Sequence, residues 1–374
     1  MSDNGHSTGW RTAAQEQEPQ ADATPQLIFT IERDSAAVLD LLRAPGLLDT
    51  LAARRYGVAL GVERLDEPTA AAARLLGGRA APLVAWLKLP PEDGYAFNLR
   101  NYPQALDRYR AFRAWALEQQ LAFDAVGLEL AAPPGLASVD DLTLRGLVHR
   151  LRLATEYVLY SAGRSAYIEL FALMRQDGYE IHTYQLPFVA DDRRAGTTLV
   201  QRALDVVDLP SDLDVLMCSS AVPSERLGSD LGGALIASYG PSADAVGIGG
   251  VSDEQEEDGI SVLPWPALRR DLLLAARYTD TIYVESLEGC VERGLLDEIG
   301  ALDWSAPAQP WRRRRALVGA MRAAIFAVLT GARFGPRALA WSGWALAALL
   351  WLRGRRATRR TAGAGAPKNT SADS

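Results

Sequence analysis

Residues 123–135, FDAVGLELAAPPG, form a short apolar run with a glutamate near its end. Side chains alternate between the two faces of a β-strand, so Val126, Leu128 and Leu130 share one face. Glu129 lies on the other face, among alanine and glycine. Because an unpaired buried carboxylate is costly, Glu129 needs a charge partner, water or a chemical role.

Seven further apolar runs of strand length occur along the chain, separated by segments rich in alanine, leucine and arginine. The eight predicted strands are residues 27–32, 57–63, 83–89, 125–130, 179–186, 213–219, 245–251 and 281–287. The predicted helices include residues 35–55, 104–121, 142–160 and 267–277. Eight alternations over about 280 residues predict an α/β protein, a (β/α)8 TIM barrel, whose usual size is about 250 residues. The alternative is a doubly wound open sheet, but its glycine-rich phosphate-binding turn is missing after the first strand.

The arrangement of Glu129 recurs at the ends of three other predicted strands. Glu32, Glu63 and Glu285 each lie opposite the bulky face of the first, second and eighth strands. The first, second and eighth strands are neighbours in a closed barrel, and barrel enzymes build their sites at the carboxyl ends of strands. We therefore expect these carboxylates to meet at one rim. Like charges held close raise at least one pKa, so one group can act as an acid while another stays ionised.

Two other roles remain open for these glutamates. In the first, Arg33, Arg64 and Lys88 neutralise them in a structural ion-pair network. In the second, the carboxylates of strands one, two and eight form an oxygen-ligand site for magnesium or manganese. The sequence predicts neither a histidine-rich zinc site nor a cofactor.

The long segments after the third and seventh strands, residues 89–104 and 249–266, are where a barrel would place binding loops. In the first of them, three aromatic residues surround Asn98, which offers ring faces for a sugar beside an amide for its hydroxyl groups; they also suit packing onto the barrel. Tyr184 and Gln185 end the fifth strand, and only one of them can face inward. His182 shares the face of Tyr184 and is expected to be a packing residue.

Residues 123–133, FDAVGLELAAP, resemble the fourth-strand signature of family-18 glycoside hydrolases, roughly F-D-G-x-D-x-D-x-E-x-P. Phe123, Asp124 and Pro133 match it, and residues 216–220, LMCSS, are loosely similar to the sixth-strand segment of the family. Three positions depart: Gly127 and Glu129 stand where the family has aspartates, and Ala131 stands where it has the catalytic acid. The resemblance implies a sugar-binding ancestry more than the substrate-assisted chemistry of the family.

Two functions are open. The first is a glycoside-hydrolase-like enzyme with Glu129 as acid/base and Glu285 as nucleophile or base. The second is a non-catalytic barrel that binds a sugar or a protein. In both, the predicted binding residues are Glu32, Glu63, Lys88, Asn98 and Tyr184.

Charge divides the 374-residue chain. Its net charge is −7, yet residues 304–374 carry +12 and the preceding residues carry −19. An apolar content of 48% suits a globular body. Cys218 and Cys290 are too few and too far apart for a disulfide framework, which favours reduced thiols in the cytosol.

The termini differ from the body. The polar composition of residues 1–25 predicts a disordered leader without a signal peptide. The predicted barrel covers residues 26–303. After it we expect a basic linker at 304–315, a helical hairpin at 316–352 and a basic tail at 353–374. The apolar run 338–352 has no charge, whereas the run 316–332 holds Arg322 near its centre, an expensive position in lipid. A membrane-spanning hairpin, two helices in the interface and two soluble helices packed on the barrel are the alternatives. Membrane association with the barrel on the cytoplasmic side is expected, with no nucleic-acid partner.

Overall fold

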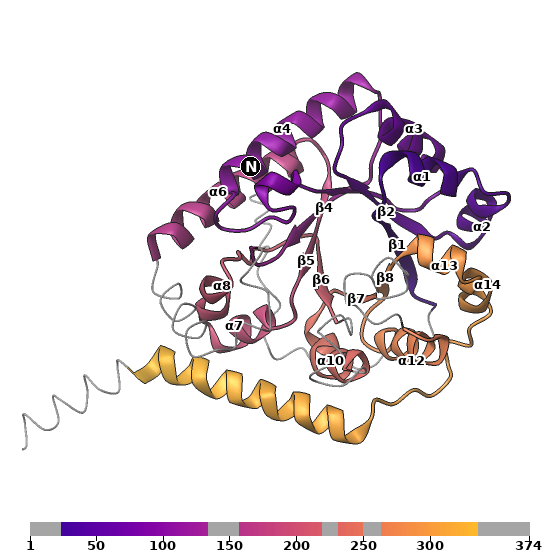
Figure 1. Cartoon of the computed structure of the whole chain (residues 1–374). Coiled ribbons are helices and arrows are strands. Elements are labelled where there is room, and N and C mark those ends of the chain that lie inside the picture. Colours follow the sequence, from indigo (N-terminus) through magenta and orange to yellow (C-terminus); the bar gives the residue numbers. More distant parts are fainter. Residues whose placement is uncertain (1–23, 134–156, 219–230, 250–262, 336–374) are drawn as a thin grey trace, which may run out of the picture.

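The computed structural model describes residues 24–133, 157–218, 231–249 and 263–335. Eight parallel strands close into a barrel in the order β1-β2-β3-β4-β5-β6-β7-β8, with β8 paired to β1. The strands are β1 Gln26–Ile31, β2 Gly57–Val62, β3 Leu83–Leu87, β4 Ala125–Leu130, β5 Glu180–Gln185, β6 Leu213–Met217, β7 Ala245–Gly249 and β8 Thr281–Glu285. The predicted TIM barrel and all eight of its strands are confirmed, and Figure 1 views the barrel along its axis.

The helices surround this barrel (Figure 1). They are α1 Ser35–Leu42, α2 Leu47–Arg54, α3 Glu67–Leu76, α4 Tyr102–Glu118, α6 Tyr157–Gln176, α7 Val189–Ala195, α8 Leu199–Ala203, α10 Gly232–Tyr239, α12 Trp265–Ala275, α13 Leu287–Glu292 and α14 Leu295–Gly300. Two short 3-10 helices, η1 Pro91–Asp93 and η3 Gly240–Ser242, lie in loops. The predicted helix 35–55 is two helices, because Gly46 adopts a left-handed conformation with φ of 81° between them.

Helix starts follow local chemistry. Asp34 caps α1 by accepting hydrogen bonds from the amides of Ala36 and Ala37. Asp66 caps α3 through the amide of Thr69 at 3.0 Å, with Pro68 in the first turn. Both caps fix where the chain leaves the carboxyl end of a strand and enters a helix, and so they fix the rim of the barrel.

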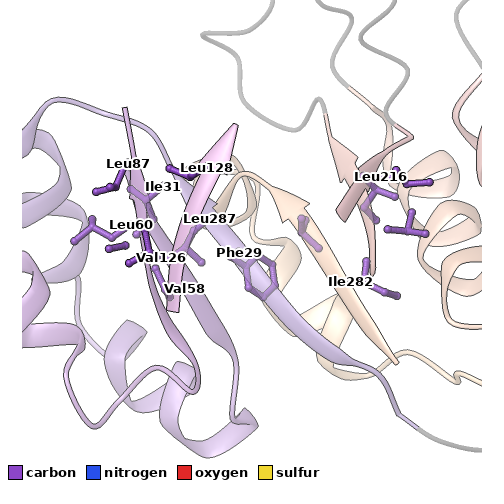
Figure 2. Packing of buried hydrophobic residues seen from close by; sticks show 14 of the residues in the cluster. Phe29, Ile31, Val58, Leu60, Leu87, Val126, Leu128, Leu216, Ile282 and Leu287 are labelled. Atoms are coloured by element: carbon purple, nitrogen blue, oxygen red, sulfur yellow. The ribbon is translucent and has the colours of Figure 1, made fainter. Parts of the chain in front are cut away.

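The strand side chains divide into two buried layers. Bulky side chains on the outer faces of the strands pack against the helices, and Figure 2 shows Val58, Leu60, Val126 and Leu128 in this layer. Each such side chain contributes about 1.5–3 kcal/mol when fully buried. The inner layer is smaller and holds Ile28, Ala59, Val84, Trp86, Ala125, Tyr184, Val215, Ala245 and Tyr283. The predicted bulky outer face is confirmed, whereas the inner face holds large side chains such as Trp86 and Tyr283 beside the small ones.

A helix beyond the barrel runs from Arg312 to Gly335 and lies outside the ring of helices, beside α7, α10 and α12 (Figure 1). It includes the arginines 312–315, which the sequence had suggested as a linker. By length and composition it is the one helix among the described residues that could cross a membrane, and 11% of its most apolar stretch is buried. The predicted leader, the second apolar run at 338–352, the tail at 353–374, most of the loop 249–266 and much of the predicted helix 142–160 lie outside the described residues.

Candidate functional site

Three of the four predicted rim glutamates line one cavity. Glu32 follows β1, Glu129 lies in β4 and Glu285 ends β8, and all three face a space of about 330 Å³ at the carboxyl ends of the strands. Glu63, which follows β2, lines an adjoining hollow of about 370 Å³ that also touches Glu32. The closed barrel brings these residues together because each occupies the inward-facing position at the end of its strand.

Lys88 joins two of these carboxylates. Its Nζ lies 2.8 Å from Glu32 Oε1 and 2.8 Å from Glu129 Oε2, and its side chain is 4% exposed. Nζ also lies 3.5 Å from the centre of the Trp86 ring, which adds a cation–π contact. Burial by itself would lower the pKa of Lys88, but the two carboxylates overcome it and raise the pKa to about 12. Lys88 is therefore a fixed positive charge between β1 and β4.

Glu285 differs from the other glutamates in its environment. Burial raises its pKa most, the charges of Glu32 and Glu129 raise it further, and Lys88 lowers it; the result is a pKa of about 7. Gly249 in β7 makes room for this side chain, because a Cβ added there would lie 2.4 Å from Glu285 Oε2. A carboxylic acid therefore stays protonated close to neutral pH beside a carboxylate that is paired with an ammonium group.

Glu32 is partly exposed at the mouth of the cavity. Its side chain is 37% exposed and contacts Lys88. Burial is the largest influence and raises its pKa, Lys88 opposes that rise, and Glu129 adds to it. Its backbone amide donates to Glu288 Oε1 at 3.2 Å, which fixes the turn after β1.

Glu63 is held by Tyr95 from the long third loop. The Tyr95 hydroxyl donates to Glu63 Oε2 at 3.0 Å, and burial together with this contact raises the pKa of Tyr95 to about 12. Tyr95 has a φ of 66°, a left-handed conformation that is unusual for a tyrosine. Together with Glu32 and Lys88, it lines both the cavity and the hollow.

Aromatic rings form the inner end of the cavity. Trp86 and Tyr184 meet with ring centroids 5.6 Å apart, and Tyr184 and Tyr283 meet at 5.1 Å. Gly127 allows this packing, because a Cβ added there would lie 2.6 Å from the Tyr184 hydroxyl oxygen. Figure 1 shows the central position of the strands that carry these rings. The cavity thus has an apolar aromatic floor and an acidic rim.

The arginines considered as neutralising partners contact other carboxylates. Arg33 pairs with Glu292 at 2.5 Å, and Arg64 pairs with Asp66 at 2.9 Å. Of the three basic residues in the proposed ion-pair network, Lys88 is therefore the one that contacts cavity glutamates.

Asn98 lies apart from the cavity in the structure. It is 3% exposed and is not among the residues that line the cavity. Its Oδ1 accepts from the amide of Arg100 at 2.9 Å, its own amide donates to Asn101 Oδ1 at 2.8 Å, and its carbonyl accepts from Tyr167. These hydrogen bonds hold the third loop in place.

The fifth strand resolves the choice between its last two residues. Tyr184 faces the barrel interior, whereas the amide of Gln185 points outward and donates to Asp208 and Asp214. His182 lies beneath Tyr184, with Nδ1 2.5 Å from the Tyr283 hydroxyl oxygen. Burial lowers the pKa of His182 to about 4, so it is a neutral packing residue, as predicted.

Trp86 and Tyr283 line the cavity but were absent from the predicted site residues. The signal for both was present in the sequence. In residues 83–89, LVAWLKL, Trp86 and Lys88 occupy alternate positions on one face, and Tyr283 is two residues from Glu285. If the alternation rule is applied to aromatic as well as charged residues, it places Trp86 and Tyr283 on the inward faces of their strands.

The positions that depart from the family-18 pattern also have structural explanations. Ala131 lines the cavity with no acid, and Tyr184 occupies the space beside Gly127. Among the described residues, no group of three or more histidine, cysteine, aspartate or glutamate side chains could hold a metal ion.

No protein-family model and no curated protein matches the sequence. Solved structures with a similar fold include the glycoside hydrolase domain of PgaB (BpsB) from Bordetella bronchiseptica, which aligns over 74% of this chain and 98% of its own at 13% identity and a TM-score of 0.44. The apo form of the 3-keto-D-glucoside 4-epimerase YcjR from E. coli aligns over 75% and 99% at 12% identity and a TM-score of 0.39. Hydroxymethylglutaryl-CoA lyase from Pseudomonas aeruginosa aligns over 85% and 98% at 14% identity and a TM-score of 0.36.

Proposed function

We propose that the chain is a hydrolase acting on a glycosidic substrate in the cavity at the carboxyl ends of the strands. The observation that carries the proposal is the contrast between two carboxyl groups. Glu285 holds a proton close to neutral pH, and Glu129 is ion-paired with Lys88. Glycoside hydrolysis needs both states, an acid for the leaving oxygen and a carboxylate that attacks carbon or activates water.

We propose the roles in the reverse of the order that the sequence favoured, because the raised pKa of Glu285 suits an acid. Glu285 donates its proton to the glycosidic oxygen as the carbon–oxygen bond breaks. Glu129 then attacks the anomeric carbon or takes a proton from the attacking water, and the water completes the hydrolysis. Lys88 orients Glu129 through their ion pair, while Glu32, which contacts the same ammonium group, stabilises positive charge on the sugar ring.

The shape of the cavity supports a sugar ring as the substrate. Trp86, Tyr184 and Tyr283 line the cavity with aromatic rings, and the carboxylates of the rim can accept hydrogen bonds from hydroxyl groups. The space of about 330 Å³ suits one or two rings, in the lower range of ligand pockets.

A second function has one observation in its favour. Ala131 lines the cavity at the position where the family-18 pattern has its acid, which is the arrangement of a barrel that binds a sugar without cleaving it. Such a barrel would keep the aromatic floor and the acidic rim, and would lack turnover.

The experiment that separates the two functions measures both turnover and binding on a panel of aryl glycosides and oligosaccharides. Glu285→Gln and Glu129→Gln should each lower kcat/KM by about 10²–10⁴ while oligosaccharide binding persists. Glu67→Gln, on the exposed surface of α3, is the matched control and should retain full activity. Binding without hydrolysis by the unaltered protein would refute the enzyme and leave the second function.

We also propose that the chain works at a membrane, on its cytoplasmic face. The support is the helix Arg312–Gly335, which is long and apolar and whose most apolar stretch is 11% buried, together with the arginines that flank the two apolar runs. Flotation of the full-length protein with vesicles of phosphatidylcholine and phosphatidylglycerol tests this, and protein that stays at the bottom of the gradient at low salt would refute it.

A further inference from the structure

The C-terminal helix turns its charged side toward the barrel. Arg322 Nε contacts Asp191 Oδ1 of α7 at 2.9 Å, and its guanidinium group lies 4.3 Å from the centre of the Tyr239 ring. The carboxylate of Asp191 is 0% exposed, so this ion pair lies inside the protein. Arg333, farther along the helix, donates to the carbonyl oxygen of Ala195 at 2.6 Å.

One flank of the helix, about 100° around its axis from Arg322, is apolar and exposed. Leu317 is 55%, Met321 37% and Val328 69% exposed, and they share one face because they are four and seven residues apart. Between residues 316 and 332 the one ionisable side chain is Arg322, which faces the barrel. The side of the helix that faces the barrel therefore combines Arg322 with the buried Val318 and Leu329, and a second apolar stripe stays exposed on its flank.

A membrane-spanning position conflicts with this contact. Arg322 lies close to the middle of the 24-residue helix, so a helix that crossed the bilayer would carry a guanidinium group near the midplane. The same movement would leave the buried carboxylate of Asp191 without its arginine. Both costs are absent when the helix stays on the barrel.

The exposed apolar stripe and the arginines at the start of the helix together suit an anionic lipid surface. Arg312, Arg313 and Arg315 are exposed at the start of the helix, where they can reach phosphate groups. The chain continues into residues 338–352, which contain three tryptophans and no charge, a composition typical of the membrane interface. A second copy of the chain would cover the apolar stripe but would not use the arginines.

We propose that the helix Arg312–Gly335 lies flat in the membrane interface while Arg322 keeps it fixed to the barrel beside α7 and α10. This inference rests on the proposed membrane association and specifies its geometry. Arg322 is a positioning residue, and the apolar stripe of Leu317, Met321 and Val328 is the surface that enters the lipid.

The test is a depth measurement on the full-length protein. Leu317→Cys, Met321→Cys and Val328→Cys are labelled with an environment-sensitive fluorophore, and quenching by lipids with nitroxides at different depths is measured on vesicles containing phosphatidylglycerol. Leu117→Cys is the matched control, because it is 80% exposed on α4, across the barrel from the helix (Figure 1). The native cysteines are buried, so the parent protein gives the background.

The proposal predicts the same shallow depth for all three labels and no quenching of the control. A spanning helix would instead separate the first and last labels by about 16 Å in depth, at 1.5 Å per residue. That result would overturn the flat geometry and leave membrane association intact. Absence of quenching at every position would refute membrane association itself. Labels that are shielded without vesicles, in a protein of twice the monomer mass, would show that a second copy covers the stripe.

Discussion

Replacing Glu285 with glutamine should make the stability of the protein less dependent on pH. The pKa of Glu285 is raised from its usual 4.5 to about 7, mainly by burial and then by Glu32 and Glu129. Below pH 4.5 the group is protonated in both the folded and the unfolded chain. Between pH 4.5 and 7 the unfolded chain releases the proton and the folded chain keeps it, so stability falls as pH rises. Above pH 7 both states are ionised and the loss is complete.

The size of this effect follows from the two pKa values. At 1.36 kcal/mol for each pKa unit, the rise from 4.5 to about 7 corresponds to on the order of 3 kcal/mol. Most of it is expressed between pH 5 and pH 8. Glu285→Gln removes this titration, so the free energy of unfolding of the variant relative to the unaltered protein should rise by about that amount between these two pH values.

Urea unfolding followed by circular dichroism at pH 5 and pH 8 measures this difference directly. Met217→Leu is the matched control, because Met217 lines the same cavity and cannot titrate. Its effect on stability should be the same at both pH values. If the effect of Glu285→Gln were independent of pH, or became more destabilising as pH rose, the electrostatic account of this residue would be wrong.

Three further changes test the surroundings of the site and of the helix. Lys88→Met removes the charge that lowers the pKa of Glu285, so activity should fall and the basic limb of the pH profile of kcat/KM should move to higher pH. Gly249→Ala should displace the Glu285 carboxyl group by steric contact and lower kcat/KM by about 10²-fold with the fold preserved by circular dichroism. Arg322→Met should destabilise the protein by about 3–5 kcal/mol in urea, because it leaves the buried Asp191 carboxylate without its arginine.

Two variants control these measurements. Gly331→Ala adds the same methyl group as the β7 variant, at a position with open space, and should leave kcat/KM unchanged. Arg333→Met removes a contact to a backbone carbonyl and leaves no buried charge, so its cost should be much smaller than that of Arg322→Met. Equal costs for the two arginine variants would contradict the role given to the Arg322–Asp191 pair. An unshifted basic limb in the Lys88 variant would contradict its effect on Glu285.

The fold could be predicted because each strand carries its own signal. The alternation of Val126, Leu128 and Leu130 with small residues indicates which face of the strand packs against the helices. Closure of the barrel then brings Glu32 and Glu285 to the same rim. Strand alternation is a local property, so one sequence is sufficient to show it.

The partners of the site residues were harder to predict, because they depend on contacts between distant segments. Lys88 was considered as a general neutralising charge, whereas it contacts Glu32 and Glu129 together. The side chain of Asn98 suited a sugar-binding residue, but Asn98 forms hydrogen bonds with Arg100 and Asn101 within the loop. Side-chain direction in a loop has no periodicity, so the sequence contains no pattern that would separate the two roles.

The C-terminal helix shows a different limit. The apolar run and its central Arg322 were visible in the sequence, and the cost of that arginine in lipid was clear. Its partner, Asp191, is 131 residues away on α7, and no local pattern connects them. The sequence therefore indicated that Arg322 needed a partner without indicating which one.

The most direct measurement of the central claim is a titration of the glutamate carboxyl groups by NMR, with ¹³C-labelled glutamate and Glu285→Gln for assignment. The account predicts one resonance that titrates close to pH 7, disappears in Glu285→Gln and moves to lower pH in Glu129→Gln, because the Glu129 charge raises the pKa of Glu285. If the Glu285 resonance titrated at its usual value of 4.5, no acid would be held ready in the cavity, and the proposed division of roles between Glu285 and Glu129 would be wrong.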